Sequence, residues 1–224
     1  MLQHVWERAN QARYLTSVVI ATDDERIRAA AESFRGRVVM TRSDHVSGTD
    51  RVAEAASASN AEIIVNIQGD EPLLDPAAID AAVLGLLDQD DIPMGTLKKR
   101  IQRPEDLRDP NVVKVVTDLA GNAIYFSRSP VPFEREPVQC DGTPAICFKH
   151  IGLYVYRRDF LLSYPDFAVG PLEQAEKLEQ LRALENGHKI RVTETDYESI
   201  GVDTAEDWRR VSALYENFVN QGNT

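Results

Sequence analysis

Two adjacent carboxylates follow a short apolar segment in the first half of the sequence. Residues 63–72 read IIVNIQGDEP, so that strand-forming residues lead into Gly69, Asp70 and Glu71 and end at Pro72. Gly69 permits a tight turn, and Pro72 lacks the N–H that ladder pairing requires, so the strand should stop here. In open parallel sheets, ligands bind beyond the carboxyl ends of the strands. We therefore expect Asp70 to face a binding crevice.

A second aspartate occupies a similar position near the C-terminus, where ESIGVDTAEDW places Asp203 after an Ile-Gly-Val run. Two aspartates on one rim could hold Mg²⁺, which binds carboxylate oxygens together with substrate phosphates and keeps several waters. Each position also has a structural interpretation. Asp70 or Glu71 could cap the helix expected from about residue 75, and Asp203 or Thr204 could cap the last helix. The two aspartates together favour a metal site.

A third polar loop, RSDHVSGTDR at residues 42–51, combines a glycine and small hydroxyl side chains with Arg42 and Arg51. The small residues would let a base or a phosphate approach the backbone, and the arginines would supply positive charge. The loop has neither the GxxxxGK[ST] pattern of a P-loop nor the GxGxxG pattern of a dinucleotide fold. A solvated connection in which His45 is merely exposed remains open.

The composition excludes one large class of partners. The 25 Lys and Arg residues are outnumbered by 36 Asp and Glu, for a net charge of −11, which argues against nucleic-acid binding. Cys140 and Cys147 have no nearby His or Cys pair that would complete a zinc site, so we expect unpaired thiols. No apolar run approaches the roughly 20 residues of a membrane span, and the N-terminus lacks an apolar signal core. We expect a cytoplasmic protein with no membrane partner.

The elements that must position these loops follow an alternating pattern. Segments 17–22, 38–41 and 63–68 are short and apolar, and each precedes a helical pattern. This alternation predicts βαβ units and an α/β fold with a mostly parallel, Rossmann-like sheet. From about residue 110 to 160 the apolar residues alternate and a turn occurs at Gly121, which predicts a smaller antiparallel subdomain. The length of 224 residues suits a single domain, although two remain possible.

The strongest helical pattern covers residues 171–188, PLEQAEKLEQLRALENGH. Apolar side chains recur there at helical spacing, and Gly187 would end the helix. We therefore expect one continuous amphipathic helix in this segment.

Six motifs occur in a characteristic order along the chain: TRSDHVSGTDR, NIQGDEP, NVVKVV with YFSRSPVP, FKHIGLYVY, PLEQAEKLEQLR and GVDTAEDW. In this order and spacing they resemble those of the 3-deoxy-manno-octulosonate cytidylyltransferases, also called CMP-Kdo synthetases. QGDEP is shared with wider nucleotidyltransferases, whereas SGTDR together with KHIGLY and LEQLR is more specific. The resemblance covers nearly the whole chain and implies a sheet of the nucleotide-diphospho-sugar transferase type.

The resemblance implies a Mg²⁺-dependent reaction in which CTP and the sugar acid 3-deoxy-D-manno-octulosonate (Kdo) give CMP-Kdo and pyrophosphate for lipopolysaccharide synthesis. Asp70 and Asp203 would be the catalytic metal ligands, and a homodimer would form through the middle portion of the chain, roughly residues 110–160. The implied nucleotide-binding residues are Arg42, Asp44, Ser47, Gly48 and Thr49, and the implied sugar-acid residues are Gln68, Arg128, His150, Tyr154, Glu179 and Gln180.

The chemistry of the implied sugar-acid residues is compatible with such a pocket. Arg128, with a contribution from His150, would bind the sugar carboxylate through charge-assisted hydrogen bonds. Glu179 and Gln180 would bind sugar hydroxyls. Without the resemblance, three structural interpretations remain open: Arg128 at an interface, His150 as a structural histidine, and Glu179 with Gln180 on the polar face of a helix.

The strand and the basic, glycine-containing loop with which this family opens have no counterpart in this sequence. The first residues, MLQHVWERA, match the helix that follows that loop. The resemblance therefore predicts a chain truncated at its N-terminus, in which the neighbouring strands have unpaired edges and the main triphosphate-binding cations are missing. The activity of such a chain is an open question.

The sequence leaves two other functions open. A glycosyltransferase that uses a nucleotide sugar would also place metal-binding aspartates after a strand. It would be expected to carry a DxD pattern, whereas QGDEP has Asp70 and Glu71 side by side. The second alternative is a truncated, inactive binding or dimerisation module.

Overall fold

The computed structural model describes residues 1–135, 146–202 and 204–221, and helices alternate with strands through its first half. No helix within these ranges is both long and apolar enough to cross a bilayer. The elements in chain order are α1 (Leu2–Ala9), β1 (Ile20–Thr22), α2 (Glu25–Ser33), β2 (Val38–Met40), α3 (Gly48–Ser57), β3 (Ile63–Asn66), α4 (Pro76–Leu87), β4 (Met94–Arg100), α5 (Pro104–Arg108), β5 (Lys114–Thr117), β6 (Ala123–Ser127), β7 (Phe148–Arg157), α6 (Arg158–Ser163), the 3₁₀ helix η1 (Tyr164–Asp166), α7 (Pro171–Glu176), α8 (Leu181–Glu185), β8 (Ile190–Glu194) and α9 (Ala205–Gln221).

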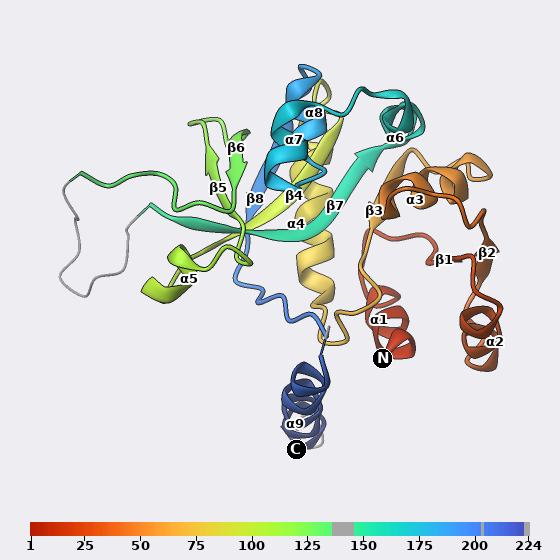
Figure 1. Ribbon diagram of the computed structural model, residues 1–224. Coiled ribbons are helices and arrows are strands. Elements are labelled where there is room, and N and C mark those ends of the chain that lie inside the picture. Colours follow the sequence, from red (N-terminus) through yellow and green to blue (C-terminus); the bar gives the residue numbers. More distant parts are fainter. Residues whose placement is uncertain (136–145, 203, 222–224) are drawn as a thin grey trace.

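A mixed six-stranded sheet forms the centre of the molecule (Figure 1). Five of its strands follow the order β6-β5-β7-β4-β8, and β3 pairs with β7. Only the β4–β8 pairing is parallel among the described strands of this sheet, because β7 runs antiparallel to β3, β4 and β5. β1 and β2 pair in parallel in a separate two-stranded sheet. The prediction of a mostly parallel sheet is therefore wrong, whereas the α/β class is confirmed.

The position of β7 explains this difference. The segment β3–α4–β4 has the sequence pattern of a βαβ unit, and β3 and β4 do run parallel to each other, since each is antiparallel to β7. A strand from far along the chain lies between them, however, and local patterns carry no information about such an insertion. The predicted antiparallel hairpin is present as β5–β6, and Gly121 adopts φ +83° in its turn, in the left-handed region that favours glycine.

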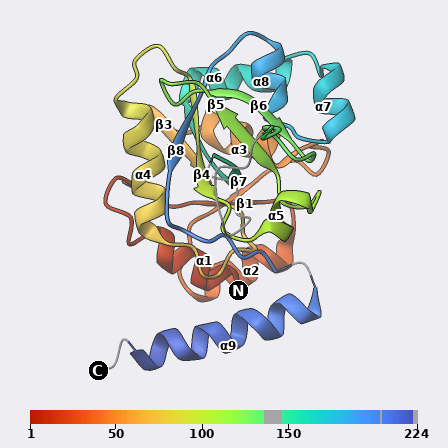
Figure 2. The same cartoon turned by 90° about the vertical axis from the view of Figure 1, so that its left-hand side faces the viewer.

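Two apolar clusters pack against opposite faces of the sheet. Alternate residues of β7 supply them: Ile151, Leu153 and Val155 belong to the cluster covered by α4, whereas Tyr156 belongs to the cluster covered by α3, α6 and α8. This period of two is the side-chain alternation of a strand buried on both faces. α9 lies at the end of the molecule next to α1 (Figure 2), where the rings of His4 and Tyr215 are 4.5 Å apart.

The continuous helix expected over residues 171–188 is wrong, because the chain breaks it after Glu176. Lys177 adopts the left-handed conformation at φ +55°, and helix resumes at Leu181 as α8. The expected end is confirmed, since Gly187 has φ +81° just beyond α8. The break leaves Glu179 and Gln180 in a connection between two short helices instead of on a helix face.

Candidate active site

Asp70 lies in the turn that follows β3, as the sequence predicts. Neither Asp70 nor Glu71 caps α4: the cap is Asp75, whose carboxylate accepts the Ala77 N–H at 2.9 Å. The Asp70 carbonyl oxygen accepts the N–H of Val202 at 3.0 Å. Asp203, the next residue in the sequence, lies outside the described residues, but the chain that leads to it is hydrogen-bonded to Asp70.

The position of Asp70 is compatible with the predicted role of its carboxylate as a Mg²⁺ ligand. No cluster of three or more His, Cys, Asp or Glu side chains suited to a metal occurs in the described ranges. Mg²⁺ does not require one, because it usually takes one or two protein carboxylates and completes its shell with waters and substrate phosphates. Within the same ranges no hydrogen bond or ion pair engages the half-buried Asp70 carboxylate. Its oxygens are therefore available to a cation.

The predicted nucleotide loop ends at the start of α3. Ser47 is the N-cap of this helix, since its Oγ accepts the Asp50 N–H at 3.2 Å, and Gly48 and Thr49 form the first turn. The Ser47 Oγ also donates to Glu179 Oε1 at 3.0 Å, across 132 residues of sequence. One serine thus joins the predicted nucleotide loop to the predicted sugar-acid segment.

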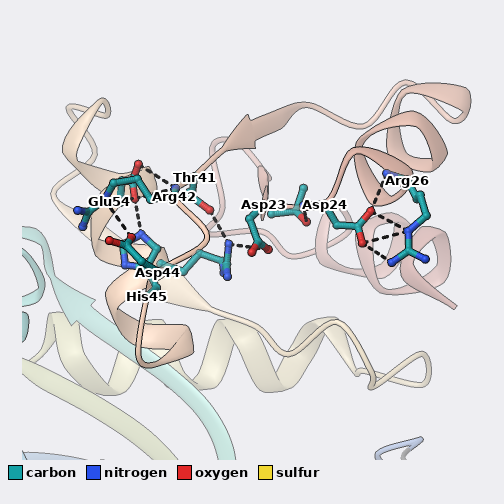
Figure 3. A network of polar contacts seen from close by, with 10 residues as sticks. Asp23, Asp24, Arg26, Thr41, Arg42, Asp44, His45 and Glu54 are labelled. Carbon is teal, nitrogen blue, oxygen red and sulfur yellow. Dashed lines mark hydrogen bonds and ion pairs between the residues drawn. The ribbon is translucent and has the colours of Figure 1, made fainter.

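Glu54 holds the other end of this loop, and sequence reasoning missed it (Figure 3). Its carboxylate accepts the backbone N–H of Arg42 at 3.2 Å, lies 3.5 Å from the Arg42 side chain and contacts His45 Nε2. The hydrogen bond from His45 lowers the pKa of Glu54 below its usual value. The His45 side chain is only 5% exposed, so the interpretation of His45 as merely exposed is wrong.

The loop also contacts the end of β1. Arg51 pairs with Asp23 at 3.0 Å and donates to Thr41 Oγ1 at 2.6 Å. Arg42 and Asp44 themselves remain mostly exposed and line a cavity of about 450 Å³ together with residues of α3 and η1. Two of the predicted nucleotide-binding residues therefore border a cavity.

Glu179 and Gln180 are withdrawn from solvent in the connection between α7 and α8. Burial raises the pKa of Glu179, and the Tyr164 hydroxyl holds its backbone by donating to the carbonyl oxygen at 2.7 Å. Gln180 is 3% exposed, and its Nε2 has no hydrogen-bond partner among the described residues. A buried amide donor without a partner is costly unless a ligand accepts its hydrogen bond.

His150 and Tyr154 lie one after the other on β7, with ring centroids 5.4 Å apart. Burial lowers the pKa of His150 to about 3, so the ring is neutral at pH 7 and supplies no positive charge. The role of His150 as a charge-assisted donor is therefore wrong. The Thr96 hydroxyl donates to the Leu153 carbonyl at 2.9 Å and contacts His150 Nε2 at 2.9 Å. This hydrogen-bond pattern assigns the ring proton to Nε2 and leaves Nδ1 as an acceptor.

Arg128 is anchored by the protein backbone. Its guanidinium donates to the Glu176 carbonyl at 2.7 Å and the Pro110 carbonyl at 2.9 Å, and its own N–H donates to the Glu176 carboxylate at 2.9 Å. These contacts fix the side chain but leave other N–H groups of the five-donor guanidinium for a ligand. Gln68 is exposed just after β3.

The sheet brings the two halves of the candidate site together. Asn66, the last residue of β3, pairs with Tyr154, and Thr96 of β4 pairs with the same tyrosine from the other side. The turn that contains Asp70 therefore begins beside the His150–Tyr154 pair. Ser47 is hydrogen-bonded to Glu179, and the His150 ring lies against Tyr154, whose pKa is raised by burial and by the charge of Glu179. Among the described residues, no hydrogen bond or ion pair joins Arg128 or Gln68 to this group.

Comparison with known proteins gives consistent results. A family model described as Cytidylyltransferase matches residues 1–190. The 3-deoxy-manno-octulosonate cytidylyltransferase of Solibacter usitatus (strain Ellin6076) is 68% identical over 222 residues, which cover 99% of this chain and 86% of that protein. The enzyme of the same name from Geobacter sulfurreducens (strain ATCC 51573 / DSM 12127 / PCA) is 56% identical over 217 residues, covering 94% and 87%.

A solved structure is similar over the same extent. The structure of CMP:2-keto-3-deoxy-manno-octonic acid synthetase complexed with CTP has 40% sequence identity and a TM-score of 0.89, and the match covers 96% of this chain and 87% of that one. These matches do not show the expected N-terminal truncation. The chain belongs to the cytidylyltransferase family, among the 3-deoxy-manno-octulosonate cytidylyltransferases.

Proposed function

We propose that the chain transfers the CMP group of CTP to Kdo, with release of pyrophosphate, and so provides activated sugar acid for lipopolysaccharide synthesis. Family membership supports this reaction. The structural observation that carries it is the hydrogen bond from Ser47 to Glu179, which joins the nucleotide loop to the sugar-acid segment at one place.

In this reaction the anomeric hydroxyl of the sugar attacks the α-phosphorus of CTP in line. A bond forms between the anomeric oxygen and the α-phosphorus, the bond to the oxygen that bridges to the β-phosphorus breaks, and the hydroxyl proton is released. The protein supplies position and charge compensation and needs no covalent nucleophile. Mg²⁺ held by Asp70 and Asp203 would neutralise phosphate charge and lower the pKa of the attacking hydroxyl.

The sugar-acid side of the site would bind mainly through neutral groups. The unpartnered Nε2 of Gln180 can donate to a sugar oxygen, and the Nδ1 of neutral His150 can accept from a sugar hydroxyl. Glu179 would accept from a second hydroxyl beside Tyr154. Arg128 would be the main cation for the sugar carboxylate, because His150 carries no charge at pH 7.

The nucleotide side would use the first turn of α3. The backbone N–H groups of Gly48 and Thr49 belong to the positive end of this helix, where negatively charged or polar ligand groups bind favourably. Arg42 and Asp44 would approach the nucleotide from the preceding loop.

We also propose that the chain forms a homodimer through residues 110–160. Among the described residues of this portion, four large apolar side chains are more than half exposed in the single chain: Leu119, Ile124, Phe133 and Ile146. Burial of such a group against a second copy would remove it from water. Light scattering coupled to gel filtration tests this proposal, and a monomer at micromolar concentration would contradict it.

The activity can be tested directly. The purified chain is incubated with CTP, Kdo and Mg²⁺, and pyrophosphate release is measured, with UTP and other sugar acids as controls. Release that requires both CTP and Kdo is the expected result. Turnover of a nucleotide sugar instead would favour the glycosyltransferase, and no turnover of any substrate would favour the inactive module.

A further inference from the structure

Glu71, the second carboxylate of QGDEP, makes two contacts far along the chain. The Tyr197 hydroxyl donates to Glu71 Oε2 at 2.9 Å, and the Ser199 hydroxyl donates to Oε1 at 2.7 Å. The sequence separations are 126 and 128 residues. Both donors belong to the irregular stretch between β8 and α9, residues 195–202, which we call the connecting segment. Both oxygens of Glu71 are thus used to hold this segment.

The connecting segment has other attachments to the body of the protein. Lys99 Nζ donates to the carbonyl of Asp196 at 2.7 Å and pairs with Glu198 at 2.9 Å. Tyr197 is 8% exposed and packs in the apolar cluster under α4. At its far end, the Val202 N–H donates to the Asp70 carbonyl at 3.0 Å. The connecting segment is therefore held at its start by Lys99 and at its end by the contact with the Asp70 turn. Glu71 holds the part between these two contacts.

From these contacts we infer that Glu71 is a positioning residue for metal and nucleotide binding: its carboxylate holds the connecting segment against the turn that presents Asp70. The inference rests on the proposed function. The Val202 N–H at the end of this segment donates to the Asp70 carbonyl, so a shift of the connecting segment changes the position from which the Asp70 carboxylate acts. Glu71 acts through the hydroxyls of Tyr197 and Ser199 and touches neither metal nor substrate.

The experiment measures binding of a divalent cation separately from catalysis. The chain is titrated with Mn²⁺ in the presence of CTP, free Mn²⁺ is measured by electron paramagnetic resonance, and the Mn²⁺ bound by CTP alone is subtracted. Glu71→Gln and the double variant Tyr197→Phe/Ser199→Ala should each weaken Mn²⁺ binding by about tenfold or more, as loss of groups that orient metal ligands generally does. Glu62→Gln, an exposed carboxylate at the other end of β3, is the matched control and should bind Mn²⁺ like the wild type.

A combined variant separates positioning from direct contact. If Glu71 acts through the two hydroxyls, Glu71→Gln should add nothing in the Tyr197→Phe/Ser199→Ala background. A further loss in that background would mean that Glu71 meets the metal or substrate itself, and unchanged binding in Glu71→Gln alone would equally overturn the inference. Thermal melts establish that each variant is folded at the assay temperature. A wild-type chain that binds no Mn²⁺ with CTP present would instead refute the proposed function.

Discussion

Replacement of Arg182 by methionine should be among the most destabilising single changes in the chain. Arg182 donates to both oxygens of Glu173, from Nε at 2.8 Å and from Nη2 at 2.6 Å, and its guanidinium lies 5.2 Å from the centre of the Tyr164 ring. The two side chains of the pair are only 9% and 12% exposed. Arg182→Met leaves the Glu173 charge without a partner in this buried place, which costs about 3–5 kcal/mol of unfolding free energy.

The measurement is urea unfolding followed by circular dichroism, with free energies from the midpoint and slope. Arg28→Met is the matched control, because Arg28 pairs with Glu25 at 2.7 Å but the two side chains are 44% and 66% exposed. Loss of such a surface pair should cost less than about 1 kcal/mol. The double variant Glu173→Met/Arg182→Met should recover most of the loss, since it leaves no buried charge. If Arg182→Met and Arg28→Met lie within about 1 kcal/mol of each other, the reasoning about burial is wrong.

Three further changes test the site. Asp70→Asn should reduce turnover by about a hundredfold or more while the melting temperature stays within about 2 °C, because no described residue pairs with the carboxylate; full activity would remove Asp70 from the metal site. Because the pKa of His150 is lowered to about 3 in the folded chain, the unfolded chain binds a proton at this residue between pH values of about 6.5 and 3, whereas the folded chain does not. The free energy of unfolding should therefore decrease as the pH is lowered from about 6.5 to about 3. This decrease should be less steep in His150→Gln than in the control His4→Gln, and parallel pH curves would contradict this. Glu54→Gln should raise the KM for CTP by about tenfold, equivalent to ~1.4 kcal/mol, with little change in kcat, whereas Glu105→Gln on the surface should leave it unchanged. An effect of Glu54→Gln on kcat alone would exclude a role in holding the nucleotide loop.

Local sequence patterns were sufficient for features that depend on neighbouring residues. The strand before Asp70 and its turn follow from the apolar run, Gly69 and Pro72. The end of α8 follows from Gly187, whose left-handed conformation is confirmed. Thr204 was one of two expected caps for the last helix, and its hydroxyl does accept the Asp207 N–H at 3.1 Å.

Features that depend on distant residues could not be predicted in the same way. No periodicity in β3 or β4 indicates that β7 separates them. The break between α7 and α8 directly follows Glu176, whose carboxylate accepts from Ser127 Oγ at 2.6 Å and from the Arg128 N–H. Such tertiary contacts can override a good helical pattern. Glu54 and Glu71 were missed as supporting groups for the same reason: their partners are visible only after folding.

The ten residues of β7 also limit how this enzyme can diverge. One edge of β7 pairs with β4 along most of its length, and the other is shared by β5 near Phe148 and by β3 near Tyr154. A one-residue insertion within the strand would turn Tyr154 toward the face where Val155 now packs, and would shift both neighbouring strands in register at once. Changes in the preference for the nucleotide or for the sugar acid are therefore expected to arise by side-chain replacement or in the loops. An insertion in β7 that suited one substrate would also disturb the binding site of the other.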